Sequence, residues 1–528
     1  MEKISVKALL EERWFFPVIF CLLVILRVSG LYQPVLDIDE SVFAEFANKL
    51  LTGSLPYTEV FDNKPPGTYY LFAAVFSIAG LSNLYAVHAV VTVIVFFTVL
   101  CLFYIVNSIY GRRAAVVTVL WYIFLTHTYE PKYISTSGEI LINLPIVLSV
   151  LCYFKGRKNS GYSMAWFAGS GLLLGGAVLI NYKAGFCALL FILDTLIMHW
   201  LVMGRSIRIF LRESSILAIT GFSAIIPVLA VSAYFYQIGV LNDFINWGFL
   251  YNFKYIDSGA ASIPPWKTAT RTSYFFISTL PVWLVIGAYL LKNKKTSPGI
   301  IHKNTFMVFT WSWLVVSLLA ALLGGRTYGH YFIQIAPPAS ILAAHAAYCL
   351  IERGGCINFL KISAVLSLFI TLLFFASRLN IDATYRFINY DNWNAQPVFR
   401  SAGAYVRANT SVNDRIYVWG WGTPVYIYSD RRCSSKVLLA NYVSGKSFGS
   451  SKDYKVTMDH TFLAMMRESF MKEFAVSPPE LFLDTEKSGL FGYDHFPVKV
   501  FPELNDFILK HYRREAEVQG IAIYRRIH

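Results

Sequence analysis

Residues 84–109 read LYAVHAVVTVIVFFTVLCLFYIVNSI and contain no Asp, Glu, Lys or Arg. A helix needs roughly 20 apolar residues to cross the hydrocarbon core of a bilayer, and this run exceeds that length. The whole chain is similarly apolar, because 56% of its 528 residues are hydrophobic and only 15% are charged. Charged residues make up about a quarter of an ordinary soluble chain, so lipid must cover much of this surface. The sequence therefore predicts a polytopic α-helical membrane protein.

Apolar segments of crossing length recur through residues 1–376. Besides 84–109, they are 14–36, 114–131, 139–154, 163–181, 185–203, 214–236, 272–291, 304–323, 331–350 and 357–376. Segment 66–80 is shorter, and at 1.5 Å per residue it spans only about 22 Å. We expect about 11–13 transmembrane helices in residues 1–376, with 66–80 lying along the membrane interface instead of crossing it.

The charge distribution sets the expected orientation. The formal net charge is +14, and basic residues cluster between apolar segments, at Arg112-Arg113, Lys155 to Lys158, Arg205 to Arg212 and Lys292 to Lys295. Lys and Arg are retained on the cytoplasmic side of membrane proteins. All four clusters are cytoplasmic if the N-terminus is cytoplasmic and 66–80 does not cross. This pattern argues against nucleic-acid binding and predicts a multi-pass protein of the cytoplasmic (inner) membrane, with loop 37–65 extracytoplasmic.

The character of the sequence changes near residue 377. Short apolar pieces typical of strands, at 415–419, 424–428, 480–484 and 520–524, alternate with helical patterns at 461–474 and 502–512. Strands that alternate with helices are typical of α/β domains. The sequence predicts a soluble extracytoplasmic α/β domain over residues 377–528.

The first outer loop, residues 37–65, is rich in acidic groups. Asp39 and Glu40 lie near its start, and residues 41–51 follow with an amphipathic helical pattern that has Glu45 and Lys49 on its polar face. Such a helix suits the membrane interface. We interpret Asp39 and Glu40 as candidate catalytic carboxylates. The alternative is that they only cap this helix, where acidic residues are favoured.

A second candidate catalytic position is Glu139, at the outer start of an apolar segment. The expected topology places it on the same side as Asp39. Two carboxylates at a membrane-edge cavity suit general-base work, with the second group orienting a substrate or a metal. Glu139 could equally be an N-terminal helix charge. A divalent cation held by Asp39 and Glu139 is left open, and no other cofactor is indicated.

Cations on the expected outer side form the third feature. They are Lys64, Lys132, Lys183, Lys254, Lys267, Arg326 and His330. Lys and Arg form charge-assisted bonds to phosphate oxygens, so these groups suit an anionic lipid phosphate at the membrane surface. We assign the phosphate-binding role to four of them, namely Lys64, Lys183, Arg326 and His330. Lys183 stands between two apolar segments, where it could instead snorkel to the interface.

The motifs of the first loop resemble those of one enzyme group. Their order is Asp39-Glu40, Gly53-x-x-Pro56-Tyr57 and Phe61-Asp62-x-Lys64-Pro65-Pro66. It resembles the bacterial dolichyl-phosphate-mannose–protein mannosyltransferase-like group of the C-type (GT-C) glycosyltransferase superfamily, which includes the lipid A aminoarabinose transferase. The resemblance extends to the Lys183 segment, to 324–332 with Pro337-Pro338 and to 418–424, so it covers most of the chain.

The resemblance implies an inverting enzyme whose donor is a polyprenyl-phosphate sugar. Asp39 matches the family's catalytic Asp, and Glu139 matches the position of its second acidic residue. Lys64 and Lys183 match residues near the donor phosphate.

Two positions depart from the aminoarabinose-transferase subgroup. That subgroup carries an Arg three residues after the catalytic Asp and a Glu before Lys-Pro-Pro, where this chain has Val42 and Asn63. These differences argue against aminoarabinose chemistry and leave the sugar open.

We therefore expect transfer of a sugar from a polyprenyl-phosphate donor to an envelope lipid, glycan or protein acceptor. The alternative is a transporter or flippase of lipid-linked sugars, which would share the helices and the outer cations. Transporters usually place ionisable residues near the bilayer midplane and in paired halves. Here polar residues gather at one face and no half-repeat is evident, which favours the enzyme.

Overall fold

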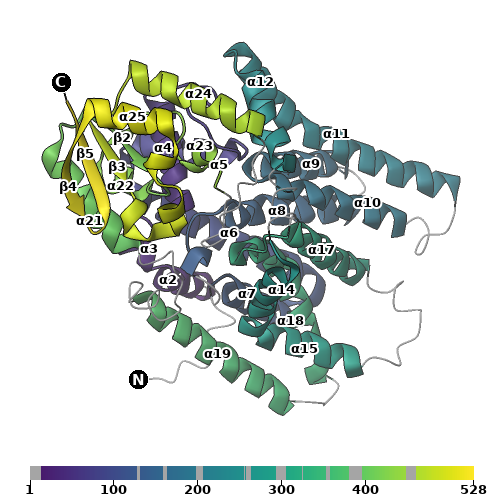
Figure 1. The fold of residues 1–528 in the computed structure, drawn as a ribbon. Coiled ribbons are helices and arrows are strands. Elements are labelled where there is room, and N and C mark those ends of the chain that lie inside the picture. The colour runs from purple at the N-terminus through teal and green to yellow at the C-terminus, as the bar shows by residue number, and fades with distance from the viewer. Residues whose placement is uncertain are drawn as a thin grey trace.

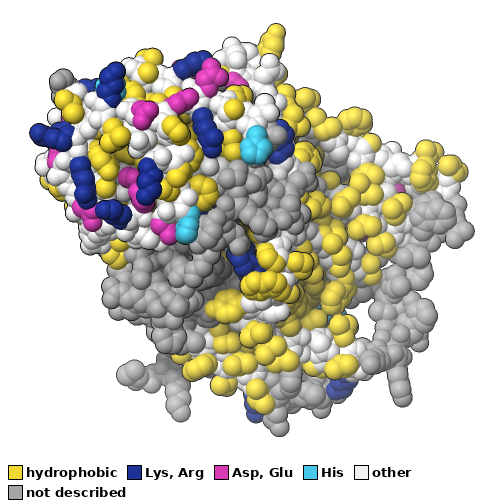
Figure 2. All heavy atoms as spheres, in the orientation of Figure 1, with side chains coloured by type: hydrophobic (Ala, Val, Ile, Leu, Met, Phe, Trp, Pro, Cys, Tyr) yellow, Lys and Arg dark blue, Asp and Glu magenta, His cyan; other side chains and the backbone are white. Residues whose placement is uncertain are grey.

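The computed structural model describes residues 14–127, 131–158, 163–197, 206–254, 256, 263–292, 305–323, 325–352, 357–379, 395–446 and 460–527. The chain first builds a large bundle of helices and then a small sheet with helices packed beside it (Figure 1). On the face seen in Figure 2, apolar side chains gather over the bundle, whereas charged side chains gather over the C-terminal part.

The bundle contains long helices joined by short connections. Its α-helices are α2 (Phe15–Leu26), α3 (Ser29–Tyr32), α4 (Ile38–Leu51), α5 (Gly67–Ala79), α6 (Leu84–Tyr110), α7 (Arg112–His127), α8 (Gly138–Lys158), α9 (Ser163–Ile180), α10 (Cys187–Ile197), α11 (Ile207–Gln237), α12 (Leu241–Asp243), α14 (Pro265–Ser278), α15 (Leu280–Lys292), α17 (Thr305–Leu322), α18 (Ala336–Glu352) and α19 (Ile357–Leu379). Shorter helical turns are η1 (Pro131–Tyr133), η2 (Tyr182–Phe186), η4 (Phe244–Leu250) and η5 (Gly329–Ile335).

Several of these helices have the length and composition of membrane spans. In the part of the chain that the structure describes, 5 helices pass this test, and α14 with α15 makes up to 6. Four shorter apolar helices, α5 among them, fall below the required length. The prediction of a polytopic helical membrane protein is confirmed, together with its multi-pass character. The number of crossings and the interfacial position of 66–80 stay predictions.

Two expected crossings are interrupted. Segment 272–291 is not one straight helix, because α14 and α15 meet at a bend of 81°. Pro281 follows the break, and proline cannot continue a regular helical hydrogen-bond ladder. Segment 14–36 is interrupted after α2, where the buried Arg27 side chain donates to Thr92 Oγ1 at 3.1 Å and to the Ile134 carbonyl at 2.7 Å.

Close packing of α9 against α11 depends on two small residues. A Cβ atom on Gly171 would lie 2.1 Å from the carbonyl oxygen of Thr220, and one on Gly175 would lie 2.1 Å from that of Ala224. Small residues four apart let two membrane helices approach closely. The bundle is therefore held here by direct backbone contact.

The C-terminal part contains a 5-stranded sheet in the order β2-β1-β3-β5-β4. Its strands are β1 (Arg415–Trp419), β2 (Arg432–Cys433), β3 (Leu481–Asp484), β4 (Tyr512–Val518) and β5 (Ile521–Arg526). Strand β1 pairs in parallel with β2 and β3, whereas β5 is antiparallel to β3 and β4. The described helices beside it are α21 (Ala395–Asn409), α22 (Pro424–Ser429), α23 (Asn441–Ser444), α24 (His460–Val476), α25 (Pro502–His511) and the short turns η6 (Glu486–Ser488), η7 (Leu490–His495) and η8 (Val498–Val500).

The α/β character predicted for this part is confirmed, with one wrong element. The predicted strand 424–428 is helix α22, which begins with a proline. Proline suits the first turn of a helix, because the N–H that it lacks would have no partner there. The apolar pattern of so short a stretch does not separate strand from helix.

The C-terminal part docks onto α4, which corrects the expected surface of that helix. Glu45 and Lys49 are buried, although the helical pattern predicts them on a polar face. Glu45 accepts a hydrogen bond from the Cys433 N–H at 2.7 Å, and Lys49 donates to the Ser435 carbonyl. The polar face of α4 therefore meets protein, because the docked sheet edge supplies the partners that water would otherwise provide.

Candidate functional site

Asp39 is presented by the first turn of α4. Asp37 is the N-cap of this helix, and its Oδ1 accepts the Asp39 N–H at 2.9 Å. Glu40 completes a capping box by accepting the Asp37 N–H at 3.3 Å. The capping alternative is thus confirmed for Glu40, whereas the N-cap is Asp37 and Asp39 is a further acidic residue of the first turn. The Asp39 carboxylate is left for other contacts.

Glu40 has a position that differs from the one we expected. It is fully buried, and its Oε1 lies 3.0 Å from His88 Nε2 and accepts the Thr136 N–H. Its Oε2 accepts the Leu36 N–H at 2.8 Å. Both oxygens are therefore engaged in joining α4, α6 and the segment after η1. We correct the assignment of Glu40 from a catalytic carboxylate to a structural one.

Four charged side chains form what we call the Asp39 group: Asp37, Asp39, Lys64 and Lys132. Lys132 Nζ lies 2.9 Å from Asp39 Oδ2 and 3.0 Å from Asp37 Oδ1. Lys64 Nζ lies 4.0 Å from the other oxygen of Asp39, Oδ1. The side chain of Asp39 is 36% exposed and that of Lys64 is 34%, whereas Asp37 is nearly buried. A substrate can therefore reach Asp39 and Lys64.

The charges of the Asp39 group favour an ionised Asp39. Burial alone would raise the pKa of Asp39, but Lys132, Lys64 and His330 together hold it well below its ordinary value. Burial raises the pKa of Asp37 to about 6, against the opposing effect of Lys132. Burial would lower the pKa of Lys132, yet the two carboxylates raise it well above its usual range. The site thus holds a carboxylate and an ammonium group in contact.

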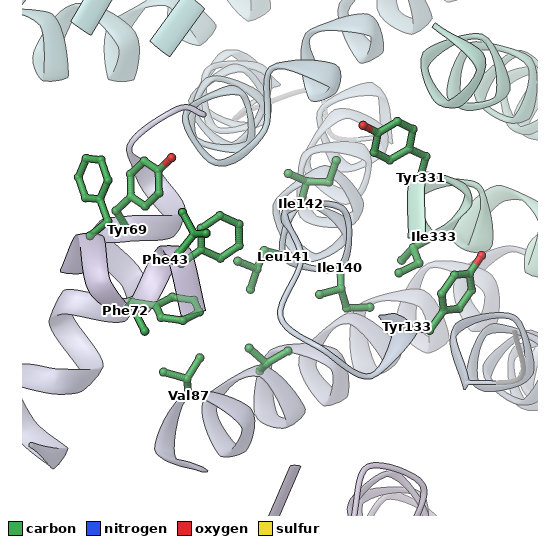
Figure 3. Close-up of a cluster of buried hydrophobic side chains, with 14 of the residues drawn as sticks. Phe43, Tyr69, Phe72, Val87, Tyr133, Ile140, Leu141, Ile142, Tyr331 and Ile333 are labelled. Atoms are coloured by element: carbon green, nitrogen blue, oxygen red, sulfur yellow. The ribbon is translucent and has the colours of Figure 1, made fainter. Parts of the chain in front are cut away.

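Lys64 is oriented by its own loop. Its Nζ lies 3.5 Å from Asp62 Oδ2, which also accepts a hydrogen bond from Tyr69 at 2.6 Å. The ammonium lies over the ring of Phe43, 4.8 Å from its centroid. Phe43 and Tyr69 belong to a buried apolar cluster that also includes Phe72 and Val87 (Figure 3). This cluster supports α4 and α5 beneath the charged groups.

A second pair lies deeper, the Glu139–Lys183 pair. Lys183 Nζ lies 3.1 Å from Glu139 Oε1, and each side chain is only 5% exposed. The ammonium lies over the ring of Tyr331, 2.7 Å from its centroid, and Figure 3 shows Tyr331 near Ile142 and Ile333. Burial lowers the pKa of Lys183 to about 8, although Glu139 acts to raise it. The snorkelling alternative is wrong, because this lysine points into the protein.

The remaining predicted phosphate ligands lie in the segment that leads into α18. His330 is buried in η5 and stacks on Tyr328 with 5.8 Å between ring centroids. It is one of the groups that act electrostatically on Asp39, so it lies close to the Asp39 group. Arg326 is also buried, and its carbonyl accepts a hydrogen bond from Arg271 at 2.7 Å. Their phosphate-binding roles stay predictions.

Asp39 and Glu139 each have a lysine partner, and a divalent cation held by both stays an open prediction. Asp39 is paired with Lys132, and Glu139 is paired with Lys183. Among the described residues, no group of three or more His, Cys, Asp or Glu side chains could hold a metal ion.

Three contributors escaped the sequence interpretation. Lys132 is recognised there as an outer cation but receives no role, and Asp37 and Asp62 receive none. The spacing of Asp37 and Glu40 matches a capping box, which could have identified Asp37. Asp62 stands inside the Phe61-Asp62-x-Lys64-Pro65-Pro66 motif. Nothing in the sequence indicates that Lys132, which is distant along the chain, meets Asp39.

Comparison with known proteins extends these observations. Residues 63–234 match the family model described as dolichyl-phosphate-mannose-protein mannosyltransferase. No curated protein sequence matches the chain.

Solved structures match over nearly the whole chain. The structure of ArnT from Cupriavidus metallidurans bound to undecaprenyl phosphate has a TM-score of 0.64 and 12% identity, covering 97% of this chain and 98% of that one. The apo structure of the same protein gives 0.61 and 13%, with 97% of each chain covered. The oligosaccharyltransferase AglB from Archaeoglobus fulgidus, in complex with an inhibitory peptide and dolichol-phosphate, gives 0.54 and 11%, covering 98% of this chain and 74% of that one.

Proposed function

We propose that this chain, which has the GT-C fold and matches a glycosyltransferase family over residues 63–234, is an inverting glycosyltransferase that uses a polyprenyl-phosphate sugar. The resemblance drawn from the first loop is supported by the family match over residues 63–234 and by the shared fold. The donor class is supported by the undecaprenyl phosphate in the ArnT structure and the dolichol-phosphate in the AglB structure. The acceptor is an envelope lipid, glycan or protein.

One observation carries the proposal: the accessible Asp39 carboxylate lies 2.9 Å from the ammonium of Lys132 and 4.0 Å from that of Lys64, and these charges favour its ionised form. In the reaction, the acceptor oxygen attacks the anomeric carbon of the donor sugar from the face opposite the phosphate. The bond from that carbon to the phosphate oxygen breaks, and its electron pair leaves with the polyprenyl phosphate. Asp39 takes the acceptor proton as general base. The departing phosphate gains one negative charge, which nearby cations stabilise.

Lys64 and Lys183 are the cations that we assign to the phosphate. Lys64 is accessible next to Asp39, and Lys183 lies deeper beside Glu139. Glu139 would hold Lys183 in place through their ion pair. Arg326 and His330 lie in the segment that leads into α18. Arg326 would add positive charge around the phosphate. Burial lowers the pKa of His330 well below its ordinary value, so His330 would donate a hydrogen bond to the phosphate as a neutral imidazole.

We place the reaction on the outer face of the cytoplasmic membrane. His88 of α6 contacts Glu40 beside the site, whereas Lys155 lies over the ring of Tyr104 on the same helix, 5.0 Å from its centroid. These two positions on α6 are about 24 Å apart along the helix axis at 1.5 Å per residue. The basic cluster 155–158 is thus at the other end of the bundle from Asp39, which supports a cytoplasmic location for the cluster and an outer location for the site.

A transfer assay tests the proposal. Purified protein in proteoliposomes receives a polyprenyl-phosphate sugar with a radiolabelled sugar, together with envelope lipid, glycan or peptide acceptors. We expect a labelled acceptor whose anomeric configuration, measured by NMR, is inverted relative to the donor. Movement of intact donor across the bilayer without any transfer would contradict the enzyme and support the flippase alternative. Mass spectrometry of envelope glycans, with and without the protein, would identify the sugar.

A further inference from the structure

Lys132 occupies a position that the proposed reaction does not yet use. It pairs with two carboxylates of the first loop, because its Nζ lies 2.9 Å from Asp39 Oδ2 and 3.0 Å from Asp37 Oδ1. Its side chain is 16% exposed, about half as much as that of Lys64. Lys132 points between two carboxylates.

The backbone around Lys132 is held rigidly. Tyr133 is buried and donates a hydrogen bond to the Gly329 carbonyl at 2.7 Å. The Ile134 carbonyl accepts the Arg27 guanidinium at 2.7 Å, and the Thr136 N–H donates to Glu40. Glu40 directly follows Asp39 in α4. The segment that carries Lys132 and the helix turn that carries Asp39 are therefore joined by a buried link beside the ion pair.

This geometry divides the two oxygens of Asp39 between two tasks. Oδ2 is occupied by Lys132, whereas Oδ1 is 4.0 Å from Lys64, beyond direct hydrogen-bond distance. The side chain remains 36% exposed, so Oδ1 is the oxygen that an acceptor hydroxyl can reach. An opposite charge in contact favours the charged form of a carboxylate. Lys132 therefore acts on both the orientation and the ionisation of Asp39.

We propose that Lys132 is a positioning residue that fixes Asp39 Oδ2 and keeps Asp39 ionised, so that sugar transfer persists when the outer face of the membrane becomes acidic. The inference rests on the proposed function, because it assumes that Asp39 is the base. A catalytic carboxylate with an ordinary pKa would become protonated in acid, and the enzyme would then lose activity. Lys132 moves that loss to a pH that the enzyme does not meet.

The other charged groups around Asp39 are consistent with this role. They are Asp37 at the N-cap of its own helix, Lys64 of the first loop and His330 of η5, while the charge of Lys132 also lowers the pKa of Lys183 of η2. Lys132 is the largest of the cationic influences on Asp39, ahead of Lys64. Asp37 opposes it by competing for the same ammonium.

The test is the pH profile of kcat/KM for transfer between pH 2 and 8, with donor binding measured separately. We expect a flat acidic side for the wild type. In Lys132→Met, the pH below which kcat/KM falls should increase by about 1 to 3 units, because an opposite charge in contact shifts a carboxyl pKa by that amount. Lys132→Arg should restore most of the wild-type profile. Donor affinity should change less than about threefold in either variant, since the lysine acts through Asp39.

Two unpaired carboxylates could prevent Lys132→Met from folding, so a second variant keeps the charge balanced. Asp37→Asn combined with Lys132→Met removes one charge of each sign, and Asn is a good N-cap. In this double variant, the pH below which kcat/KM falls should increase by the same amount. An active wild type whose profile is unchanged in the single or the double variant would overturn the role of Lys132. A wild type without transfer activity would instead contradict the proposed function.

Discussion

The Asp39 group and the Glu139–Lys183 pair use the same residue types in different surroundings. In the Asp39 group, the side chains of Asp39 and Lys64 are each about one-third exposed. Asp39 shares Lys132 with Asp37, and it shares Lys64 with Asp62. In the Glu139–Lys183 pair, both side chains are 5% exposed and each is the other's ion-pair partner. The first arrangement leaves an oxygen open to a substrate, and the second leaves almost none.

This difference indicates separate contributions to one reaction. An accessible base changes the rate of a chemical step when it is removed, with little effect on folding. A buried ion pair chiefly affects the folded state, because removal of one partner leaves an unpaired charge in a poorly hydrated place. Mutations at the two places should therefore separate catalysis from stability.

The largest effect is expected for Asp39→Asn. Asparagine keeps the shape of the side chain but cannot accept the acceptor proton, and positioned base catalysis contributes roughly 100-fold to 10,000-fold. We expect kcat to fall within that range while donor binding and thermal unfolding stay near those of the wild type. Asp506→Asn on the exposed face of α25 is the matched control and should be normal. Wild-type rates in Asp39→Asn would show that Asp39 is not the base.

The next effect concerns the Glu139–Lys183 pair. Glu139→Gln leaves Lys183 buried without its counter-charge, which should lower the free energy of unfolding by about 3–5 kcal/mol. The double change Glu139→Gln with Lys183→Met should recover much of that stability and still bind the donor weakly. Thermal unfolding and donor binding in detergent measure the two properties. If stability and donor binding recover together, Lys183 has no role at the phosphate.

A smaller effect is expected at Glu45, which shares α4 with Asp39. Glu45→Ala removes the acceptor of the buried Cys433 N–H, and such a loss costs about 1–3 kcal/mol. Glu45→Gln keeps a carbonyl acceptor for that N–H. Burial raises the pKa of Glu45 and so favours its neutral form, which glutamine resembles, so Glu45→Gln should lower the free energy of unfolding by less than Glu45→Ala. The turnover of folded protein should be near normal in both variants. A loss of turnover as large as that of Asp39→Asn would mean that docking of the C-terminal part controls the chemistry.

The smallest effect is a pH dependence of donor binding. The pKa of Lys183 is lowered to about 8, so this lysine is charged below that pH and loses its charge as the pH rises through it. We expect the donor Kd to increase by up to roughly tenfold between pH 7 and 9, since Lys183 is about nine-tenths charged one pH unit below its pKa and about one-tenth charged one unit above it. Lys183→Arg should abolish this increase, because arginine stays protonated. Glu139, Lys132 and Tyr331 are the groups beside Lys183, and none of them should mask the change.

Much of the architecture follows from local sequence patterns. Helices α6, α8, α9 and α17 lie close to the predicted segments, because a long apolar run in a membrane protein has one stable backbone solution, the helix. Strands β1, β3 and β5 were also predicted, while β4 was missed because charged residues fill it. The break just before Pro281 and the helix at Pro424 show where proline overrode an apolar pattern.

The sequence by itself determined the membrane class, the identity of Asp39, Glu139, Lys64 and Lys183 as candidates, and the family resemblance. These depend on composition and on motifs that are contiguous in the chain. Only the tertiary structure decided which charges meet. Lys132 pairs with Asp39, Glu40 becomes a buried structural link, and Glu45 faces the docked sheet. The physical reason is that an ion pair or a desolvated carboxylate depends on groups far apart in sequence, whose approach is set by the packing of the whole bundle.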